Sequence, residues 1–360
     1  MNTLDFDLQL QQGAFALNAR CELPAAGVTG VFGHSGSGKT TLLRCLAGLA
    51  RARGKIRLGD ALWQDGSGLF RSVQQRGAGF VFQTPRLFQH LSVRANLQYG
   101  YRRTPPEGRQ VQWSHAIEVL GLADLLERRV PGLSAGEQQR VAIGRALLSS
   151  PRLLLMDEPL AALDIKRKRE ILPFIRRAAV EFGIPVMLVS HSLQELLQIA
   201  DRLVLLDRGS VIAAGELNSV LTQLPLLGYL GDTAGSLLHA RIAAHEFEYG
   251  LTRLECHGQP LWVPQRDMDI GQTRRVFVAA RNVSIALQPV AVPFSMLNVL
   301  AAVVVEIGEH SDDGAAVLIK LDVGMPMLAS ITRKSLALLK LSIGQRVYAY
   351  VKTVSLESEL

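Results

Sequence analysis

The stretch GHSGSGKT, residues 33–40, has the residue types and spacing of a phosphate-binding loop. It follows the apolar run VTGVFG and precedes an expected helix, which is the context that such a loop requires. Its glycines let backbone N–H groups turn toward phosphate oxygens at the positive end of the helix. The expected nucleotide contacts are the loop and the next residue: Gly33, His34, Ser35, Gly36, Ser37, Gly38, Lys39, Thr40 and Thr41.

Two acids at the end of another apolar run complete this chemistry. Lys39 can reach the β- and γ-phosphates of ATP, and the Thr40 hydroxyl can take one position on Mg²⁺. Asp157 and Glu158 follow the run LLLM, where two carboxylates are costly unless a cation or a water molecule needs them. We expect Asp157 to bind Mg²⁺ and Glu158 to polarise the attacking water.

Two further polar residues end expected strands. Gln83 ends GFVFQ and His191 ends VMLVSH, and open α/β sheets bind ligands at the carboxyl ends of their strands. A single histidine in this place is more often structural. The order lysine, glutamine, Asp-Glu, histidine along the chain favours catalytic roles for both, with Gln83 also a candidate Mg²⁺ ligand.

The elements that must position these residues change character along the chain. Strands alternate with helices up to about residue 230, which predicts an α/β P-loop fold with a mainly parallel sheet. Short strands then predominate and predict a small all-β, OB-like barrel. We expect an ATP-binding domain over 1–233 with a helical subdomain at about 84–150, a β-rich linker region over 234–290, and a barrel over 291–356.

The composition sets limits on the class of protein. The chain has 360 residues, a net charge of +7 and three widely spaced cysteines, which predict a reducing compartment and no disulfide framework. Residues 283–305 carry no charge but contain Pro289 and Pro293, so we expect no membrane span. The basic run 166–169 is interpreted as a solvated helix face, and no nucleic-acid partner is expected.

The stretch LSAGEQQR, residues 133–140, resembles the signature motif of ABC-transporter ATPases. The resemblance covers roughly residues 1–230 and includes the phosphate loop, Gln83, LLLMDEP, the ALD run at 162–164 and His191, all in family order. Ala135 and Glu137 stand where the family usually has glycine and glutamine, whereas Gly136 keeps the family's residue. The following helix would aim its positive end at a nucleotide.

The resemblance implies a homodimer in which two chains meet head to tail. Ser134 and Gly136 of one chain would cap the γ-phosphate that Lys39 of the other chain holds. Asp164 would lie at the dimer seam, Glu158 would orient water, and His191 would contact the γ-phosphate. Gln83 would report the nucleotide state, and Phe15 is the candidate for stacking on adenine.

Within this family the chain is most similar to the ATPase subunit of molybdate importers. That resemblance implies two copies of a transmembrane permease and, indirectly, a periplasmic oxyanion-binding protein. It also implies a peripheral position on the cytoplasmic face of the bacterial inner membrane. Sulfate, iron(III) and sugar importers remain alternatives, and a non-transport ABC ATPase is a remote one, since the chain shows one cassette and no heptad repeats.

The last part of the chain resembles a Mop-type (TOBE) domain. The residues that match its oxyanion pattern are Ser295, Asn298, Thr332, Ser335 and Lys352. Hydroxyls, N–H groups and one cation suit a tetrahedral dianion such as molybdate. Leu297 stands where oxyanion-binding members carry arginine, so a barrel that dimerises or braces the ATPase remains an equal alternative.

Overall fold

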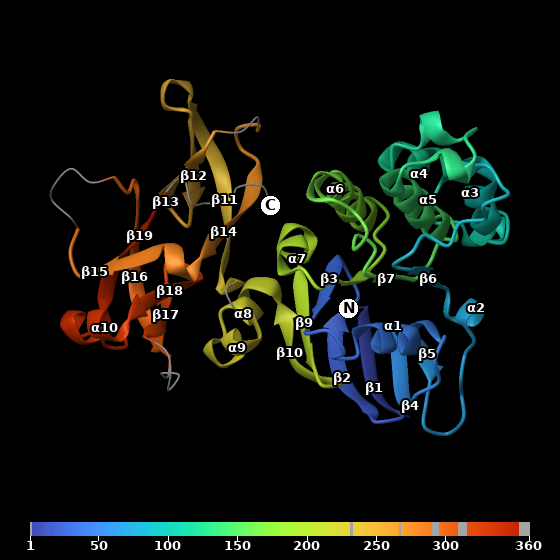
Figure 1. Cartoon of the computed structure of the whole chain (residues 1–360), viewed down its shortest axis with the longest axis horizontal. Coiled ribbons are helices and arrows are strands. Elements are labelled where there is room, and N and C mark those ends of the chain that lie inside the picture. The colour runs from blue at the N-terminus through green and yellow to red at the C-terminus, as the bar shows by residue number, and fades with distance from the viewer. Residues whose placement is uncertain (1, 231–232, 266–267, 290–294, 309–314, 353–360) are drawn as a thin grey trace. The chain divides into compact units, whose positions relative to one another are not determined.

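The computed structural model describes residues 2–230, 233–265, 268–289, 295–308 and 315–352 (Figure 1). The chain divides into two compact units, Met1–Gly215 and Glu216–Leu360. The segment 216–233, which we expected to end the ATP-binding domain, therefore belongs to the second unit.

The first unit is built on a ten-stranded sheet with the order β5-β4-β1-β2-β10-β9-β3-β8-β7-β6. The strands are β1 (Thr3–Gln12), β2 (Phe15–Pro24), β3 (Val28–Phe32), β4 (Arg53–Leu58), β5 (Ala61–Gln64), β6 (Ala78–Val81), β7 (Leu153–Asp157), β8 (Val186–Val189), β9 (Arg202–Asp207) and β10 (Ser210–Glu216). β1 pairs antiparallel with β2 and with β4, which gives this end of the sheet the alternating burial seen along β2.

The other end of the sheet is parallel and explains where the polar residues gather. β9, β3, β8, β7 and β6 lie in this order and run in the same direction. β7 and β8 are buried along their whole length, as their unbroken apolar sequences predict. Because parallel strands end at one edge, the segments that follow β3, β7 and β8 meet there.

The helices of the first unit fall into two groups. α1 (Lys39–Ala47) packs its leucines into the sheet core, and α6 (Ile165–Glu181) and α7 (Leu193–Ile199) flank the connection through β8. α3 (Val93–Tyr101), α4 (Trp113–Val119) and α5 (Ala135–Leu147) form a separate helical group beyond β6 and β7 (Figure 1). The short α2 (Val73–Arg76) precedes β6.

The second unit begins with α8 (Leu217–Leu221) and α9 (Leu227–Leu230) and then forms two antiparallel sheets. The first has the order β13-β12-β11-β14 and the second, which is OB-like, the order β15-β19-β16-β17-β18. Their strands are β11 (Gly235–Glu246), β12 (Leu251–Cys256), β13 (Gln259–Pro264), β14 (Thr273–Ala279), β15 (Val283–Ala286), β16 (Asn298–Ile307), β17 (Ala316–Asp322), β18 (Pro326–Thr332) and β19 (Arg346–Val351), with α10 (Arg333–Leu339) after β18.

The two sheets of the second unit share one apolar core, which joins residues of β11–β14 to residues of β16–β19. Side-chain amides add a polar connection. The Asn298 side chain on β16 accepts from the Trp262 backbone N–H and donates to its carbonyl at 2.9 Å. The Gln259 side chain on β13 bonds in return to the N–H and carbonyl of Ala301. The region that we expected to be a β-rich linker thus packs as a four-stranded sheet.

Several element boundaries differ from those expected from the sequence. β6 ends at Val81, two residues before Gln83, and β12 begins at Leu251 because Phe247–Tyr249 form a 3₁₀ turn. The uncharged run at 283–305 contains β15 and the start of β16. Among the described residues, none of the helices is both long enough and apolar enough to cross a membrane.

Candidate functional site

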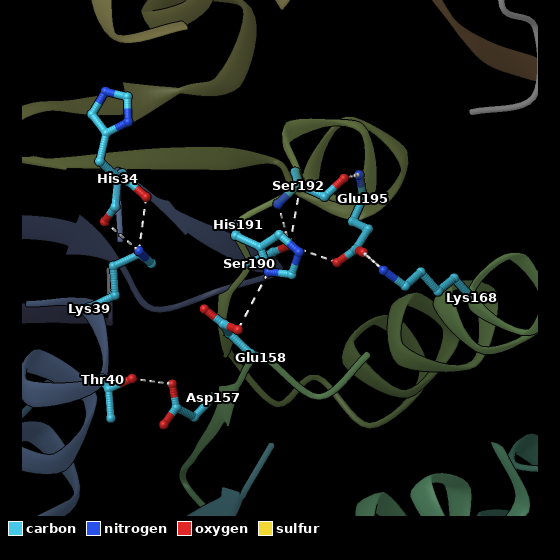
Figure 2. A network of polar contacts seen from close by, with 11 residues as sticks. His34, Lys39, Thr40, Asp157, Glu158, Lys168, Ser190, His191, Ser192 and Glu195 are labelled. Atoms are coloured by element: carbon cyan, nitrogen blue, oxygen red, sulfur yellow. Dashed lines mark hydrogen bonds and ion pairs between the residues drawn. The ribbon is translucent and has the colours of Figure 1, made fainter. Parts of the chain in front are cut away.

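The phosphate loop joins β3 to α1 and encloses a buried lysine. Lys39 Nζ donates to the carbonyls of Gly33 at 2.8 Å and His34 at 2.9 Å (Figure 2). Gly38 has a φ of 101°, and a Cβ at this position would lie 2.6 Å from the Phe15 ring. The buried Ser37 hydroxyl has no hydrogen-bond partner in the described structure. A buried ammonium group whose hydrogen bonds go to two backbone carbonyls suits a phosphate that supplies further acceptor oxygens.

Asp157 and Thr40 form the second part of the site. The Thr40 hydroxyl donates to Asp157 Oδ1 at 2.8 Å, across the gap between the start of α1 and the end of β7 (Figure 2). Burial raises the pKa of Asp157, although the Thr40 hydrogen bond opposes this shift. Burial likewise lowers the pKa of Lys39, against the opposite pull of Glu158 and Asp157. Both groups are therefore buried where water cannot fully solvate their charged forms. This is expected at a site where a bound ligand compensates for the lost solvation.

The oxygen pair suits Mg²⁺. This ion prefers oxygen ligands and is commonly held by one or two protein groups together with substrate phosphates. Within the described parts of the chain, no cluster of three or more His, Cys, Asp and Glu side chains could hold a metal ion by itself. One carboxylate and one hydroxyl beside a phosphate loop are consequently a fitting site for a nucleotide-bound magnesium ion.

Glu158 and His191 lie next to each other although they follow different strands. His191 Nδ1 is 3.4 Å from Glu158 Oε2 (Figure 2). The backbone of Glu158 has a φ of 46°, in the left-handed region, and its N–H donates to the Val189 carbonyl at 3.1 Å. Such a conformation costs roughly 1–3 kcal/mol in a residue other than glycine and is found mainly where function requires it. The left-handed turn lets Glu158 face the nucleotide loop directly after a buried strand.

A cavity of about 380 Å³ brings several of these residues together. Its size lies within the range of small-molecule sites. It is lined by Gln12, Phe15, Ser35, Gly36, Gly38, Lys39, Thr40, Thr41 and Glu158. Phe15, our candidate for stacking on adenine, thus lies beside the phosphate loop.

Gln12 has no counterpart among the residues that we expected from the sequence. It lies opposite Phe15 across the tight turn between β1 and β2. The turn sequence QQGAF could have indicated this pairing, because a hairpin places the residues on either side of its turn next to each other.

The signature stretch lies apart from this cavity within the same chain. Ser134 caps the N-terminus of α5, where its hydroxyl accepts from the Glu137 N–H at 3.3 Å. Glu137 Oε2 in turn accepts from the Ser134 N–H at 2.7 Å. These bonds from the backbone and hydroxyl of Ser134 lower the pKa of Glu137. Ser134 and Gly136 line a second cavity, of about 290 Å³, which is also lined by Arg167, Glu170 and other residues of α6.

Asp164 and Gln83 lie at the surface of the first unit. Asp164 is exposed and caps α6 through a 2.9 Å hydrogen bond from the Arg167 N–H. Gln83 is exposed beyond the end of β6, and it lies outside the set of residues that line the phosphate-loop cavity. Gln83 is therefore not among the residues of the candidate nucleotide site, and its role at the metal stays a prediction.

The five expected oxyanion residues of the second unit have different surroundings. Ser295 and Lys352 are exposed. Asn298 is fully buried and bonds to the Trp262 backbone. Thr332 caps α10, where its hydroxyl accepts from the Ser335 N–H at 3.0 Å and bonds to the Ser335 hydroxyl. Three of the five matches therefore have a structural use in the barrel.

Comparisons with known proteins agree with this geometry. Residues 17–161 match the family model described as ABC transporter, and residues 295–357 match the TOBE domain. The solved structure of cbiO1 from Clostridium perfringens, described as part of the ABC transporter complex cbiONQ, is similar with a TM-score of 0.53 and 26% identity. That similarity covers 63% of this chain and 93% of cbiO1. The parallel sheet, phosphate loop and acid pair thus define an ATP-binding protein of the ABC transporter class.

Relatives that match nearly the full length of the chain identify a family within this class. Molybdenum import ATP-binding protein ModC 1 of Azotobacter vinelandii is 47% identical over 97% of both chains. The ModC protein of Aromatoleum aromaticum is 49% identical over 95% of this chain and 91% of its own. That of Pseudomonas syringae pv. tomato is 45% identical over 99% of both. The chain belongs to this family of molybdenum import ATP-binding proteins.

The burial of Asn298 generates the first prediction. Asn298→Ala removes both partners of the Trp262 backbone groups, so it should lower the free energy of unfolding of the second unit by about 2–4 kcal/mol. Urea unfolding followed by tryptophan fluorescence measures this change. Ser295→Ala, at an exposed bend, is the matched control and should leave stability unchanged. Unchanged stability of Asn298→Ala together with lost molybdate binding would instead identify Asn298 as an oxyanion ligand.

Proposed function

We propose that this chain is the ATP-hydrolysing subunit of an importer that takes up molybdate, with tungstate as a mimic, in preference to sulfate, iron(III) or a sugar. The ATPase part is supported by the geometry around Lys39, Asp157 and Glu158. The cargo is supported by one observation: the similarity to molybdenum import proteins extends over both units and nearly the full length of the chain.

ATP binds at the phosphate loop in this proposal. Lys39 and the loop N–H groups hold the β- and γ-phosphates, and Phe15, which lines the same cavity, stacks on the base. Thr40 and Asp157 would hold Mg²⁺, which would neutralise charge on the phosphate oxygens when bound. No covalent intermediate is required, since phosphoryl transfer to water needs positioning and charge stabilisation above all.

Glu158 is the residue that we assign to the attacking water. Its side chain borders the phosphate-loop cavity, so its carboxylate can reach a water next to a phosphate bound there. His191, 3.4 Å from that carboxylate, is assigned to the γ-phosphate. Gln83, which follows the end of β6, is assigned to report the nucleotide state to the partner. It acts only when the nucleotide complex closes.

The site is completed by a second copy of the chain. Ser134 is exposed at the start of α5, where a helix N-terminus favours a phosphate, and Gly136 lines the same cavity as Ser134. Both lie outside the phosphate-loop cavity of their own chain. A head-to-tail homodimer places them over the partner's nucleotide, with the exposed Asp164 at the seam.

The membrane partner is proposed to be a permease present in two copies, with a periplasmic oxyanion-binding protein acting indirectly. A cavity of about 610 Å³ between β6 and the helical group offers a docking groove for a permease loop. Its lining includes Phe80, Phe82, Phe88, Tyr99, Arg103 and Arg145. Aromatic and arginine side chains are typical of the centres of protein interfaces. The chain would then lie on the cytoplasmic face of the inner membrane.

Replacement of the water-orienting acid tests the ATPase proposal. Glu158→Gln should retain ATP binding but lower the hydrolysis rate by about 10²–10⁴-fold, because the amide cannot polarise water as the carboxylate does. Phosphate release by the purified chain, together with nucleotide binding, measures this. Glu107→Gln, an exposed acid in the helical group, is the control. Near-normal turnover of Glu158→Gln would remove Glu158 from this role.

The two-chain site makes a separate prediction. Ser134→Ala should spare nucleotide binding by the monomer but weaken ATP-dependent dimerisation, since one phosphate donor is lost in trans. Size-exclusion chromatography with ATP measures the dimer. Ser92→Ala removes the N-cap of α3 in the same helical group and controls for the lost cap. Loss of nucleotide binding by isolated Ser134→Ala monomers would refute the in-trans assignment.

The cargo is tested by transport. The chain is reconstituted in lipid vesicles with its candidate permease and a periplasmic oxyanion-binding protein, and ATP-dependent uptake of molybdate and sulfate is compared. We expect uptake of molybdate, competition by tungstate, and little uptake of sulfate. A preference for sulfate would overturn the molybdate assignment and leave the ATPase proposal intact.

A further inference from the structure

Glu195 is a buried acid that none of the roles above uses. It lies on α7, four residues after His191, and its side chain is 9% exposed. Its two oxygens have different partners: Oε1 accepts from Lys168 Nζ at 2.8 Å, and Oε2 accepts from the Ser190 hydroxyl at 2.6 Å (Figure 2). Charge-assisted bonds of this length are strong, and a carboxylate buried in this way loses much if either partner is removed.

The Ser190 end of this network holds the backbone on both sides of His191. While the Ser190 hydroxyl donates to Glu195, its oxygen accepts from the Ser192 N–H at 3.0 Å, so the bond spans the histidine. The Ser190 N–H donates to the Val31 carbonyl at 3.3 Å, in the strand that leads to the phosphate loop. The His191 ring itself is 57% exposed, so its backbone has to determine where the ring lies.

The Lys168 end of the network reaches a different surface. Lys168 lies in the first turn of α6, and its N–H donates to the Asp164 carbonyl at 3.0 Å. The turn that begins at Asp164 is thus connected through one ion pair to the segment that carries His191. A displacement of the first turn of α6 changes the position of Lys168, and Glu195 passes this change to Ser190.

We propose that Glu195 is a positioning residue for ATP hydrolysis. It holds the His191 segment so that the ring meets Glu158, and through Lys168 it ties this contact to the start of α6. The inference rests on the proposed function, since it assigns a task to Glu195 in that reaction. The rate of hydrolysis then depends on the position of the first turn of α6, next to Asp164, as well as on the residues that contact ATP.

Steady-state kinetics of the purified full-length chain tests this proposal. Glu195→Gln cannot accept from both Lys168 and Ser190 as the carboxylate does, and Lys168→Met removes the ion pair. Both should lower kcat roughly 10- to 100-fold, as loss of positioning does. The KM for ATP should stay within about two-fold, because neither residue lines the nucleotide cavity.

Two further variants separate positioning from general damage. Lys168→Arg keeps the ion pair and should recover most of kcat. Lys166→Met removes an exposed lysine from the same helix turn and should leave kcat and Tm as in the wild type. If Glu195→Gln does not fold, Lys168→Met and its arginine counterpart decide the question.

The route through the histidine has its own test. In a His191→Ala background, Glu195→Gln should change the residual turnover by less than about two-fold, because residues acting as a unit are not additive. Wild-type kcat in a folded Glu195→Gln protein overturns the proposal. So does an equal loss with and without His191. Absence of hydrolysis by the wild-type chain would count against the proposed function instead.

Discussion

The burial of opposite charges at the carboxyl edge of the parallel sheet is the constraint on which the first unit depends. Lys39 and Asp157 are both buried. Burial lowers the pKa of Lys39 and raises that of Asp157, and both shifts favour the uncharged form. A carboxylate or ammonium group in such surroundings lowers stability unless a ligand compensates it. A phosphate chain with its cation offers both compensating charges at once. The fold keeps this cost because the ligand offsets it when it binds.

The same edge explains why the reacting groups come from distant parts of the sequence. The phosphate loop follows β3, the acids end β7, and His191 follows β8, and these three strands are direct neighbours in the order β3-β8-β7. Glu158 leaves its strand in a left-handed conformation, which turns its carboxylate toward both the loop and the histidine. The turn is supported by a backbone bond to Val189, so β8 positions the acid as well as the histidine.

Sequence patterns predicted the first unit well because its signals are local. A glycine-rich loop between a strand and a helix, or two acids after an apolar run, specifies both the element and its chemistry. What they could not give was contacts made in three dimensions. Glu195, for example, bonds to Lys168 across 27 positions of sequence. The packing of β11–β13 against the barrel sheet was likewise not expected, because the burial of these strands depends on residues of the partner sheet.

In the second unit, the same sequence motif can indicate either a binding site or a structural feature. The resemblance interprets Thr-x-x-Ser at 332–335 as part of a ligand site, whereas the structure shows a helix cap. The Thr332 hydroxyl accepts from the Ser335 N–H and so caps the start of α10. Asn298 likewise uses its amide to satisfy the outer side of an edge strand. The Asn298 bonds join the two sheets of the second unit, whereas the Thr332 bonds stay within the start of α10. The matches at Asn298, Thr332 and Ser335 are therefore accounted for by structural bonds, and Leu297, next to Asn298 in sequence, carries no charge.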